Sequence, residues 1–146
     1  MMYSMLYDET TFYQSFIRDL ENCNKEVIIE SPFITTERMK IFIPVFKNLL
    51  ERKVKIYIMT RDPKEHGESM ETQSESAIHL CEVMGIQVLI CLGNHHRKLA
   101  ILDREVLWEG SLNILSQTHS REIMRRMKNK ELAIQMFEFL RLVRFI

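Results

Sequence analysis

The sequence lacks several features that would place a protein in a class at once. Its 146 residues include only three cysteines, Cys23, Cys81 and Cys91, an odd number without the spacing of a metal or disulfide motif. We interpret them as buried thiols in a reducing cytosol. No charged-then-apolar leader opens the chain, and no uninterrupted apolar run approaches the length of a membrane span. The pattern therefore predicts a cytoplasmic protein that does not enter the membrane.

Net charge is also absent, because 20 lysine and arginine residues balance 20 aspartate and glutamate residues. Domains that bind nucleic acid over a broad surface are usually basic, so any binding here must come from a local patch. What the chain does have is apolar side chains, which make up 46% of the residues. That is enough for a core in a chain with the length of one domain, residues 1–146.

The apolar residues recur at helical and strand spacings along the chain. The expected helices cover about residues 12–22, 36–53, 72–84 and 130–146, and the expected strands cover 26–30, 54–59, 86–91, 99–102 and 106–108. Residues 1–7 are a candidate edge strand, 60–75 an exposed loop, and 114–129 a polar, basic and partly helical segment. The near-continuous apolar run 86–91 predicts a central strand buried on both faces. The alternation predicts an α/β fold, a mixed sheet flanked by helices.

A polar pair precedes the last predicted strands. His96 and Lys98 are two residues apart, so in a strand their side chains share one face. The apolar runs 99–102 and 106–108 follow, separated by the charged triplet 103–105. This is the pattern of a strand, a tight turn and a returning strand.

The returning strand leads into a second polar group. If the turn centres near Arg104, Gly110 comes to lie opposite Lys98. Ser111 and Asn113 then flank the histidine of the first strand. One hairpin would thus gather a histidine, a lysine, a hydroxyl, an amide and a glycine backbone into one pocket.

These residue types suit phosphodiester chemistry. A neutral imidazole can attack phosphorus and hold it covalently. A lysine cation and amide donors can hold the equatorial oxygens as charge builds in the transition state. A glycine lets backbone N–H groups approach those oxygens without a Cβ in the way. No carboxylate cluster or Cys/His cage is required, so we expect neither a metal nor another cofactor.

The ordered set resembles the signature of the phospholipase D superfamily, His-x-Lys-x4-Asp followed by Gly-Ser-x-Asn. The matching positions are His96, Lys98, Asp103, Gly110, Ser111 and Asn113. The family often has a glutamate shortly after the asparagine, and Glu122 is the candidate. The resemblance covers most of the chain in layout but only residues 94–122 in motif. It implies a phospholipase D-like fold.

Full-length relatives carry two copies of the signature, whereas this chain carries one. The resemblance then points to short, single-motif members, which are nucleases that pair two chains in one site. It implies a homodimeric, metal-independent phosphodiesterase, an endonuclease that cleaves DNA or RNA through a phosphohistidine. His96 of one chain would attack and His96 of the other would protonate the leaving oxygen. Lys98 and Asn113 would bind the phosphate, and Ser111 and Gly110 would support the pocket.

Other residues near the signature are assigned with alternatives open. Asp103 lies at the predicted turn and is expected to orient the hairpin rather than to react. Arg125 and Arg126 belong to a basic run, residues 121–130, which either tracks a nucleic-acid backbone or forms a solvated face. His95 adjoins the proposed nucleophile, but side-chain alternation points it to the other face.

Two further function classes stay open at this point. A phospholipase or phosphatidyltransferase that acts on lipid shares the signature, but this chain offers no amphipathic membrane face with a basic flank. A non-catalytic module would keep the fold for dimerisation or DNA docking. Family members of this size also occur as appendages of larger enzymes, so a fused or associated DNA-processing domain stays open as well. Turnover of nucleic acid against phospholipid would discriminate among these classes.

Overall fold

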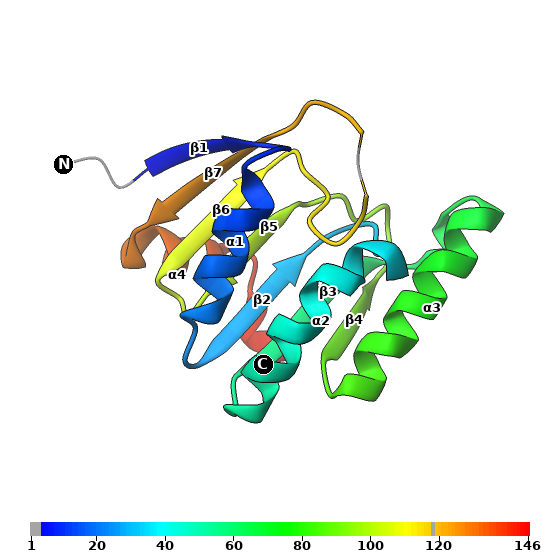
Figure 1. The fold of residues 1–146 in the computed structure, drawn as a ribbon, viewed down its shortest axis with the longest axis horizontal. Coiled ribbons are helices and arrows are strands. Elements are labelled where there is room, and N and C mark those ends of the chain that lie inside the picture. Colours follow the sequence, from blue (N-terminus) through cyan, green and yellow to red (C-terminus); the bar gives the residue numbers. More distant parts are fainter. Residues whose placement is uncertain (1–3, 118) are drawn as a thin grey trace.

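A mixed β-sheet runs through the middle of the molecule (Figure 1). The computed structural model describes residues 4–117 and 119–146, and within them seven strands follow the order β1-β7-β6-β5-β2-β3-β4. The strands are β1 (Ser4–Asp8), β2 (Glu26–Glu30), β3 (Lys55–Arg61), β4 (Gln87–Cys91), β5 (Leu99–Leu102), β6 (Val106–Gly110) and β7 (Ile123–Lys128). Strands β2, β3 and β4 are parallel, and the other neighbours are antiparallel.

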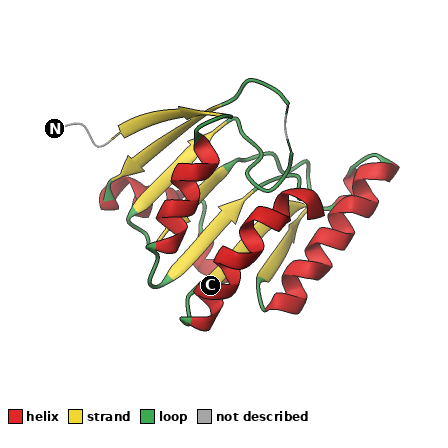
Figure 2. Cartoon of the chain, viewed as in Figure 1, coloured by secondary structure: helices red, strands yellow, loops and turns green. Residues whose placement is uncertain are grey.

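Helices cover both faces of this sheet unequally. The first three helices, α1 (Phe12–Glu21), α2 (Thr36–Glu51) and α3 (Glu68–Met84), lie on one face (Figure 2). On the other face lie α4 (Lys130–Phe139) and the short 3-10 helix η2 (Leu142–Phe145), while η1 (Pro63–Glu65) connects β3 to α3. The predicted α/β fold, a mixed sheet flanked by helices in a single domain, is confirmed. No helix in the described part of the chain is both long enough and apolar enough to span a membrane.

The larger core lies between the sheet and the first three helices. Phe12, Phe16 and Leu20 recur at helical spacing along α1, and each is fully buried. The rings of Phe12 and Phe16 meet the buried Trp108 edge-on, with centroids 5.1 and 5.8 Å apart. The indole Nε1 of Trp108 donates to Asp19 Oδ2 at 2.9 Å. Burying each large apolar side chain contributes about 1.5–3 kcal/mol.

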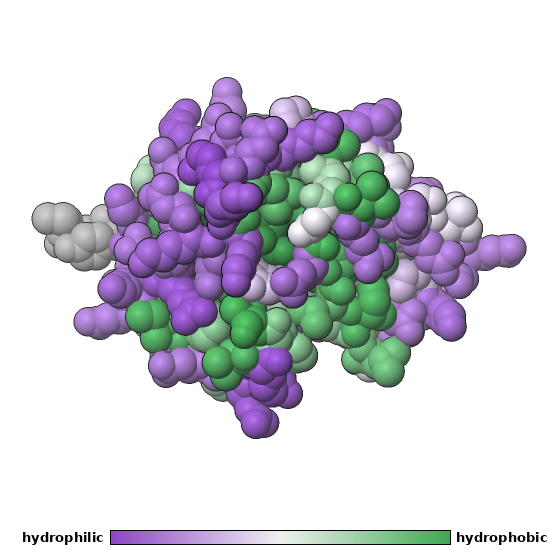
Figure 3. All heavy atoms as spheres, turned by 90° about the horizontal axis from the view of Figure 1, so that it is seen from below, coloured by the Kyte–Doolittle hydropathy of each residue, from purple (hydrophilic) through white to green (hydrophobic). Residues whose placement is uncertain are grey.

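The second face of the sheet is covered more thinly. Phe137 of α4 is buried against the sheet, but Phe139, two residues later, is 80% exposed. Leu6 of β1 and Ile123 of β7 are each 61% exposed. The lower side of the molecule, at right angles to the view of Figure 1, also has hydrophobic side chains at its surface between hydrophilic ones (Figure 3). This face therefore presents apolar surface that a further layer could cover.

The prediction that residues 86–91 form a central strand is wrong. Strand β4 is an edge strand that pairs with β3 alone. Val88 packs partly buried against the core on the α3 side and Leu89 against the core on the other face, whereas the side chain of Ile90 is 46% exposed. An apolar run shows that a strand is partly buried, but it does not distinguish a central strand from an edge strand with a neighbour on one side.

The partly helical segment predicted for residues 114–129 is also wrong at its end. Residues 123–128 form β7, which pairs with β6 and with β1 in antiparallel register. Such pairing between distant segments leaves no local periodicity in the sequence. The candidate edge strand at residues 1–7 is confirmed in its described part by β1.

Two helix boundaries differ from the prediction. Helix α3 begins at Glu68, so the predicted loop 60–75 is shorter than expected. The last helix ends at Phe139, because Arg141 takes a left-handed conformation with φ of 54° and the chain continues as η2. A helix that is apolar on most sides gives no internal signal for that break.

Candidate active site

The signature residues lie on the hairpin formed by β5 and β6. Asp103 and Arg104 occupy the turn with φ of 54° and 53°, the positive values that a two-residue hairpin turn requires. At the open end, the N–H of Gly110 donates to the carbonyl of Lys98 at 3.3 Å. The predicted register, with Gly110 opposite Lys98, is therefore confirmed.

Asp103 is structural at the turn end of this hairpin. Its carboxylate accepts hydrogen bonds from the backbone N–H groups of Asn24, Lys25 and Glu26 at 2.9, 2.8 and 3.0 Å. Five residues of strand separate it from Lys98, on the order of 16 Å. The structure therefore does not bring Asp103 to the histidine, and the carboxylate instead fixes the turn to the start of β2.

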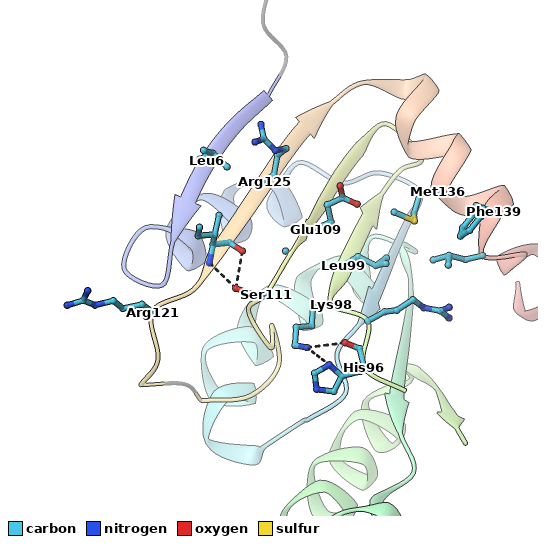
Figure 4. Close-up of a pocket in the computed structure, with 14 residues that line it drawn as sticks. Leu6, His96, Lys98, Leu99, Glu109, Ser111, Arg121, Arg125, Met136 and Phe139 are labelled. Carbon is cyan, nitrogen blue, oxygen red and sulfur yellow. Dashed lines mark hydrogen bonds between the residues drawn. The ribbon is translucent and has the colours of Figure 1, made fainter. Parts of the chain in front are cut away.

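His96 and Lys98 lie at the opposite end of β5 and line a pocket of about 770 Å³ (Figure 4). The ammonium Nζ of Lys98 donates to the carbonyl of His96 at 3.0 Å and lies 2.9 Å from the ring Nδ1. Partial burial lowers the pKa of Lys98, and the carboxylate of Glu122 opposes that shift. The structure thus brings His96 and Lys98 into contact, with Glu122 near enough to influence the lysine.

The contact between lysine and histidine restricts the histidine. An ammonium group can only donate, so the Nδ1 of His96 accepts and the proton of the neutral ring lies on Nε2. An arriving phosphate would compete for the ammonium of Lys98. Binding of an anion would therefore release the imidazole from its resting contact.

Gly110 and Ser111 line the same pocket and join the hairpin to β7. A Cβ on Gly110 would lie 2.1 Å from the carbonyl oxygen of Ile123 and 2.9 Å from the Cα of Met124. The glycine is thus required by the close approach of β7, a reason that differs from the predicted one, because its N–H is already bonded to Lys98. The hydroxyl of Ser111 accepts from the N–H of Ile123 at 3.0 Å.

Asn113 lies in the loop that follows β6 and does not line the pocket. Its side-chain Oδ1 is buried and finds no hydrogen-bond partner among the described residues. The loop is anchored on both sides, since Tyr13 Oη donates to the carbonyl of Ile114 at 2.8 Å and the N–H of Leu115 donates to Ser31 Oγ at 3.1 Å. A buried acceptor without a partner is the kind of group that a bound ligand would satisfy.

The predicted basic run is divided between the two faces of β7. Arg125 lines the pocket together with Arg121. Arg126 points to the opposite face, where its Nε lies 2.6 Å from Asp19 Oδ2 and its Nη2 lies 3.0 Å from Oδ1. Hydrogen bonding to Asp19 raises the pKa of Arg126. Arg126 is therefore held by Asp19 and does not line the pocket with Arg125, so a role for it in substrate binding stays a prediction.

Sequence reasoning missed the apolar wall of the pocket. It consists of Leu6, Leu99, Ile123, Met136, Phe139 and Leu140. Met136 and Phe139 come from α4 and Leu6 from β1, which are distant in sequence from the signature (Figure 4). No motif in the sequence connects these segments, because only the sheet order brings them together.

Two glutamates behind the signature were also missed. The carboxylate of Glu65 accepts from the N–H groups of Gly93 and Asn94 at 3.0 and 3.1 Å. Glu30, at the end of β2, lies 2.8 Å from Nε2 of His95. In the part of the chain that the structure describes, no group of three or more His, Cys, Asp or Glu side chains is arranged to hold a metal ion.

Comparison with known families and structures adds a relationship over most of the chain. A family model described as cardiolipin synthase, PLD-like domain, matches residues 16–142. No curated protein matches the chain. The fold resembles Nuc from Salmonella typhimurium, described as a phospholipase D family member, with a TM-score of 0.74 at 16% identity over 93% of this chain and 90% of Nuc.

Two further solved structures have a fold similar to that of this chain. NucT from Helicobacter pylori matches with a TM-score of 0.68 at 18% identity, over 93% of this chain and 91% of NucT. Phosphatidylserine synthase from Haemophilus influenzae matches with a TM-score of 0.68 at 14% identity, over 97% of this chain but 38% of the synthase. The chain thus has nearly the extent of the two compact proteins and corresponds to one part of the synthase.

Proposed function

The chain belongs to the phospholipase D superfamily, and on that premise we propose that it is a metal-independent phosphodiesterase, an endonuclease that cleaves DNA or RNA. In this proposal residues 1–146 form one phospholipase D-like domain, which acts as a homodimer. One observation carries the proposal: the imidazole of His96 and the ammonium of Lys98 lie 2.9 Å apart in a pocket large enough for a phosphodiester.

The proposed reaction has two steps. The unprotonated ring nitrogen of His96 attacks phosphorus, and the P–O bond to the leaving group breaks. The protonated His96 of the second chain gives its proton to the leaving oxygen. Water, deprotonated by that same imidazole, then breaks the P–N bond and releases the phosphomonoester. Lys98 offsets the charge on the equatorial oxygens in both steps, and Asn113 is proposed as the amide donor.

The charge around the pocket supports a nucleic-acid substrate. Lys98, Arg97, Arg121 and Arg125 line it, whereas Glu109 is the acidic residue among the lining side chains. A chain without net charge therefore concentrates cations where a phosphate backbone would pass. The resemblance agrees with this, because it identifies the single-motif branch with nucleases.

The thinly covered face of the sheet supports a homodimer. The pocket holds one His96, while the two-step reaction needs two imidazoles. A two-fold axis beside the pocket would place the same residue of both chains face to face. It would also cover exposed apolar side chains at the pocket wall, such as Leu6, Ile123 and Phe139. A DNA-processing domain that is fused to or associated with the chain would have to leave this face free.

The same apolar wall favours the lipid-acting alternative. Leu99, Met136 and Phe139 lie beside Lys98 and could contact an acyl chain whose phosphate rests on the ammonium. Under this alternative the protein would be a phospholipase or a phosphatidyltransferase. The same signature would perform the chemistry, so only the substrate separates the two functions.

We further propose that the protein works in the cytoplasm. Cys23, Cys81 and Cys91 are all free thiols. Burial raises the pKa of both the Cys23 and the Cys81 thiol to about 12, which keeps them protonated and unreactive. Free thiols persist in reducing compartments.

Turnover assays test the proposal. The purified protein is incubated with single- and double-stranded DNA, RNA and phospholipid vesicles, with and without EDTA. We expect cleavage of a nucleic acid that EDTA leaves unchanged and that His96→Asn abolishes. His79→Asn is the matched control, because His79 is an exposed histidine on α3 that does not line the pocket. Cleavage of phospholipid alone would establish the lipid alternative, and no turnover of any substrate would leave a non-catalytic module.

A further inference from the structure

A buried carboxylate lies directly behind the segment that carries the proposed nucleophile. Glu30 is the last residue of β2, and its side chain is 0% exposed. Its Oε1 lies 2.8 Å from Nε2 of His95 and 3.1 Å from Nε of Arg97. A fully buried carboxylate is costly unless it is paired, so two cationic partners on one oxygen are a specific arrangement.

The two partners of Glu30 flank the proposed nucleophile in sequence. His95 precedes His96 and Arg97 follows it. The side chains of His95 and Arg97 both reach Glu30, and Arg97 also borders the pocket that His96 and Lys98 line. The carboxylate thus contacts the residues immediately before and after His96.

The backbone of this segment has few other constraints. Residues 94–98 belong to no strand, and the ladder with β2 begins only at Leu99, which pairs with Glu30. Upstream, the carboxylate of Glu65 holds the N–H groups of Gly93 and Asn94. Apart from the hydrogen bond that the N–H of Gly110 donates to the carbonyl of Lys98, contacts of side chains therefore hold the stretch between Asn94 and Leu99.

The histidine that pairs with Glu30 is charged at neutral pH. Contacts with the Cys91 thiol and with the Glu30 carboxylate raise the pKa of His95 to about 9, although burial opposes the shift. The His95 ring is therefore an imidazolium at neutral pH. The side chain of His95 is 8% exposed, so water screens its attraction to Glu30 only weakly.

We propose that Glu30 is a positioning residue, which holds His95 and Arg97 and thereby fixes the direction in which His96 enters the pocket. This inference rests on the proposed function, in which the imidazole of His96 attacks phosphorus. Catalysis by a positioned nucleophile depends on placement to a fraction of an ångström. Glu30 does not line the pocket, so its effect passes through His95 and Arg97, the residues on either side of His96.

The test compares Glu30→Gln with Glu26→Gln. Both glutamates lie on β2 and both pair with an arginine, but Glu26 contacts Arg104 at the end of β2 away from the pocket. Steady-state cleavage and amide hydrogen exchange over residues 93–98 are measured on the full chain. We expect Glu30→Gln to lower kcat by about tenfold to a hundredfold, to change KM by less than about threefold, and to speed exchange in that segment. Glu26→Gln should leave all three unchanged.

Several outcomes would overturn the inference. One is a folded Glu30→Gln protein with the kcat of the wild type. Another is a loss of kcat without faster exchange over residues 93–98, because Glu30 would then act by charge and not by position. If Glu30→Gln does not fold, His95→Gln carries the same test, since Glu30 keeps its pair with Arg97. A wild type that cleaves no phosphodiester would defeat the proposed function, while the exchange comparison would still decide whether Glu30 holds the segment.

Discussion

Strand β2 begins and ends with a glutamate that pairs with cations from the β5 side of the sheet. At its start, Glu26 uses both carboxylate oxygens, which accept from Nε and Nη2 of Arg104 at 2.9 and 3.2 Å. At its end, Glu30 uses one oxygen for both partners, and the buried Oε2 has no hydrogen-bond partner among the described residues. Both carboxylate oxygens of Glu26 therefore have hydrogen-bond partners, whereas Oε2 of Glu30 has none among the described residues.

The same contrast holds for the hairpin that packs beside β2. At the turn, the carboxylate of Asp103 satisfies three backbone N–H groups. At the open end, the ammonium of Lys98 rests on the imidazole of His96, and the buried amide oxygen of Asn113 has no partner within the described residues. Buried acceptor oxygens without a partner among the described residues thus occur at the end of the sheet that carries His96 and Lys98. The turn end of the hairpin is therefore held by its own hydrogen bonds, whereas the other end carries the residues of the proposed active site.

The largest expected effect is the loss of activity from a substitution at the pocket end of the hairpin. His96→Asn should lower kcat by more than about a thousandfold, because it removes both the nucleophile and the general acid of the dimer. The side chain is exposed, so the free energy of unfolding should change by well under ~1 kcal/mol. Turnover and denaturant unfolding measure the two quantities, with His79→Asn as the control. Residual activity of a tenth of the wild type would show that His96 is not the nucleophile.

The second prediction concerns the turn end of the β5–β6 hairpin, which Asp103 holds. Asp103→Ala removes the acceptor of three backbone hydrogen bonds and places an alanine at a positive φ. We expect a loss of roughly 3 kcal/mol in the free energy of unfolding, with a kcat within about threefold of the wild type for the folded protein. Urea unfolding and turnover at low temperature check this. A large loss of kcat at unchanged stability would mean that Asp103 belongs to the catalytic machinery after all.

The third prediction uses the pH dependence of stability to test the ion pair between His95 and Glu30. Contacts with Cys91 and Glu30 raise the pKa of His95 to about 9, above its ordinary value of about 6.5. A raised histidine pKa contributes stability that is fully present below the ordinary pKa and is lost as pH rises through the folded-state value. The wild type should therefore lose on the order of 2–3 kcal/mol of unfolding free energy between about pH 6.5 and 10, relative to His95→Gln. Parallel curves for the two proteins would refute the charged pair.

The smallest expected effect compares two adjacent arginines. Arg125→Glu should weaken nucleic-acid binding by about tenfold and make its salt dependence shallower, because the side chain lines the pocket. Arg126→Glu should leave binding by the folded protein nearly unchanged but should destabilise it, since it places a carboxylate against Asp19. Fluorescence anisotropy at several salt concentrations and thermal unfolding distinguish them. Equal effects on binding would mean that the basic run acts as one patch.

The sequence allowed the hairpin to be predicted because its determinants are local. Strand alternation places His96 and Lys98 on one face, and the spacing around Arg104 sets the register with Gly110. The α/β class followed equally from local periodicity. Local pattern also assigned Arg125 and Arg126 to one patch, which adjacent positions on a strand cannot form when one of them has an ion-pair partner on the other face.

The rest depends on contacts between distant segments. Strand β7 forms only because β1 and β6 lie on either side of it, and β4 is exposed only because no strand follows it at the edge. The pairing of Glu30 with His95 joins residues 65 positions apart, so no spacing in the sequence reveals it. Sheet order determines these features, and sheet order has no short motif.

The measurement that tests the central claim most directly is capture of the covalent intermediate. The protein is mixed with a model phosphodiester, quenched within a turnover and digested for mass spectrometry under conditions that preserve phosphohistidine. The account predicts an acid-labile phosphoryl adduct on the peptide that contains His96, at one per two chains, unchanged by EDTA and absent from His96→Asn. Turnover that proceeds without this adduct, or an adduct whose formation needs a divalent ion, would contradict it.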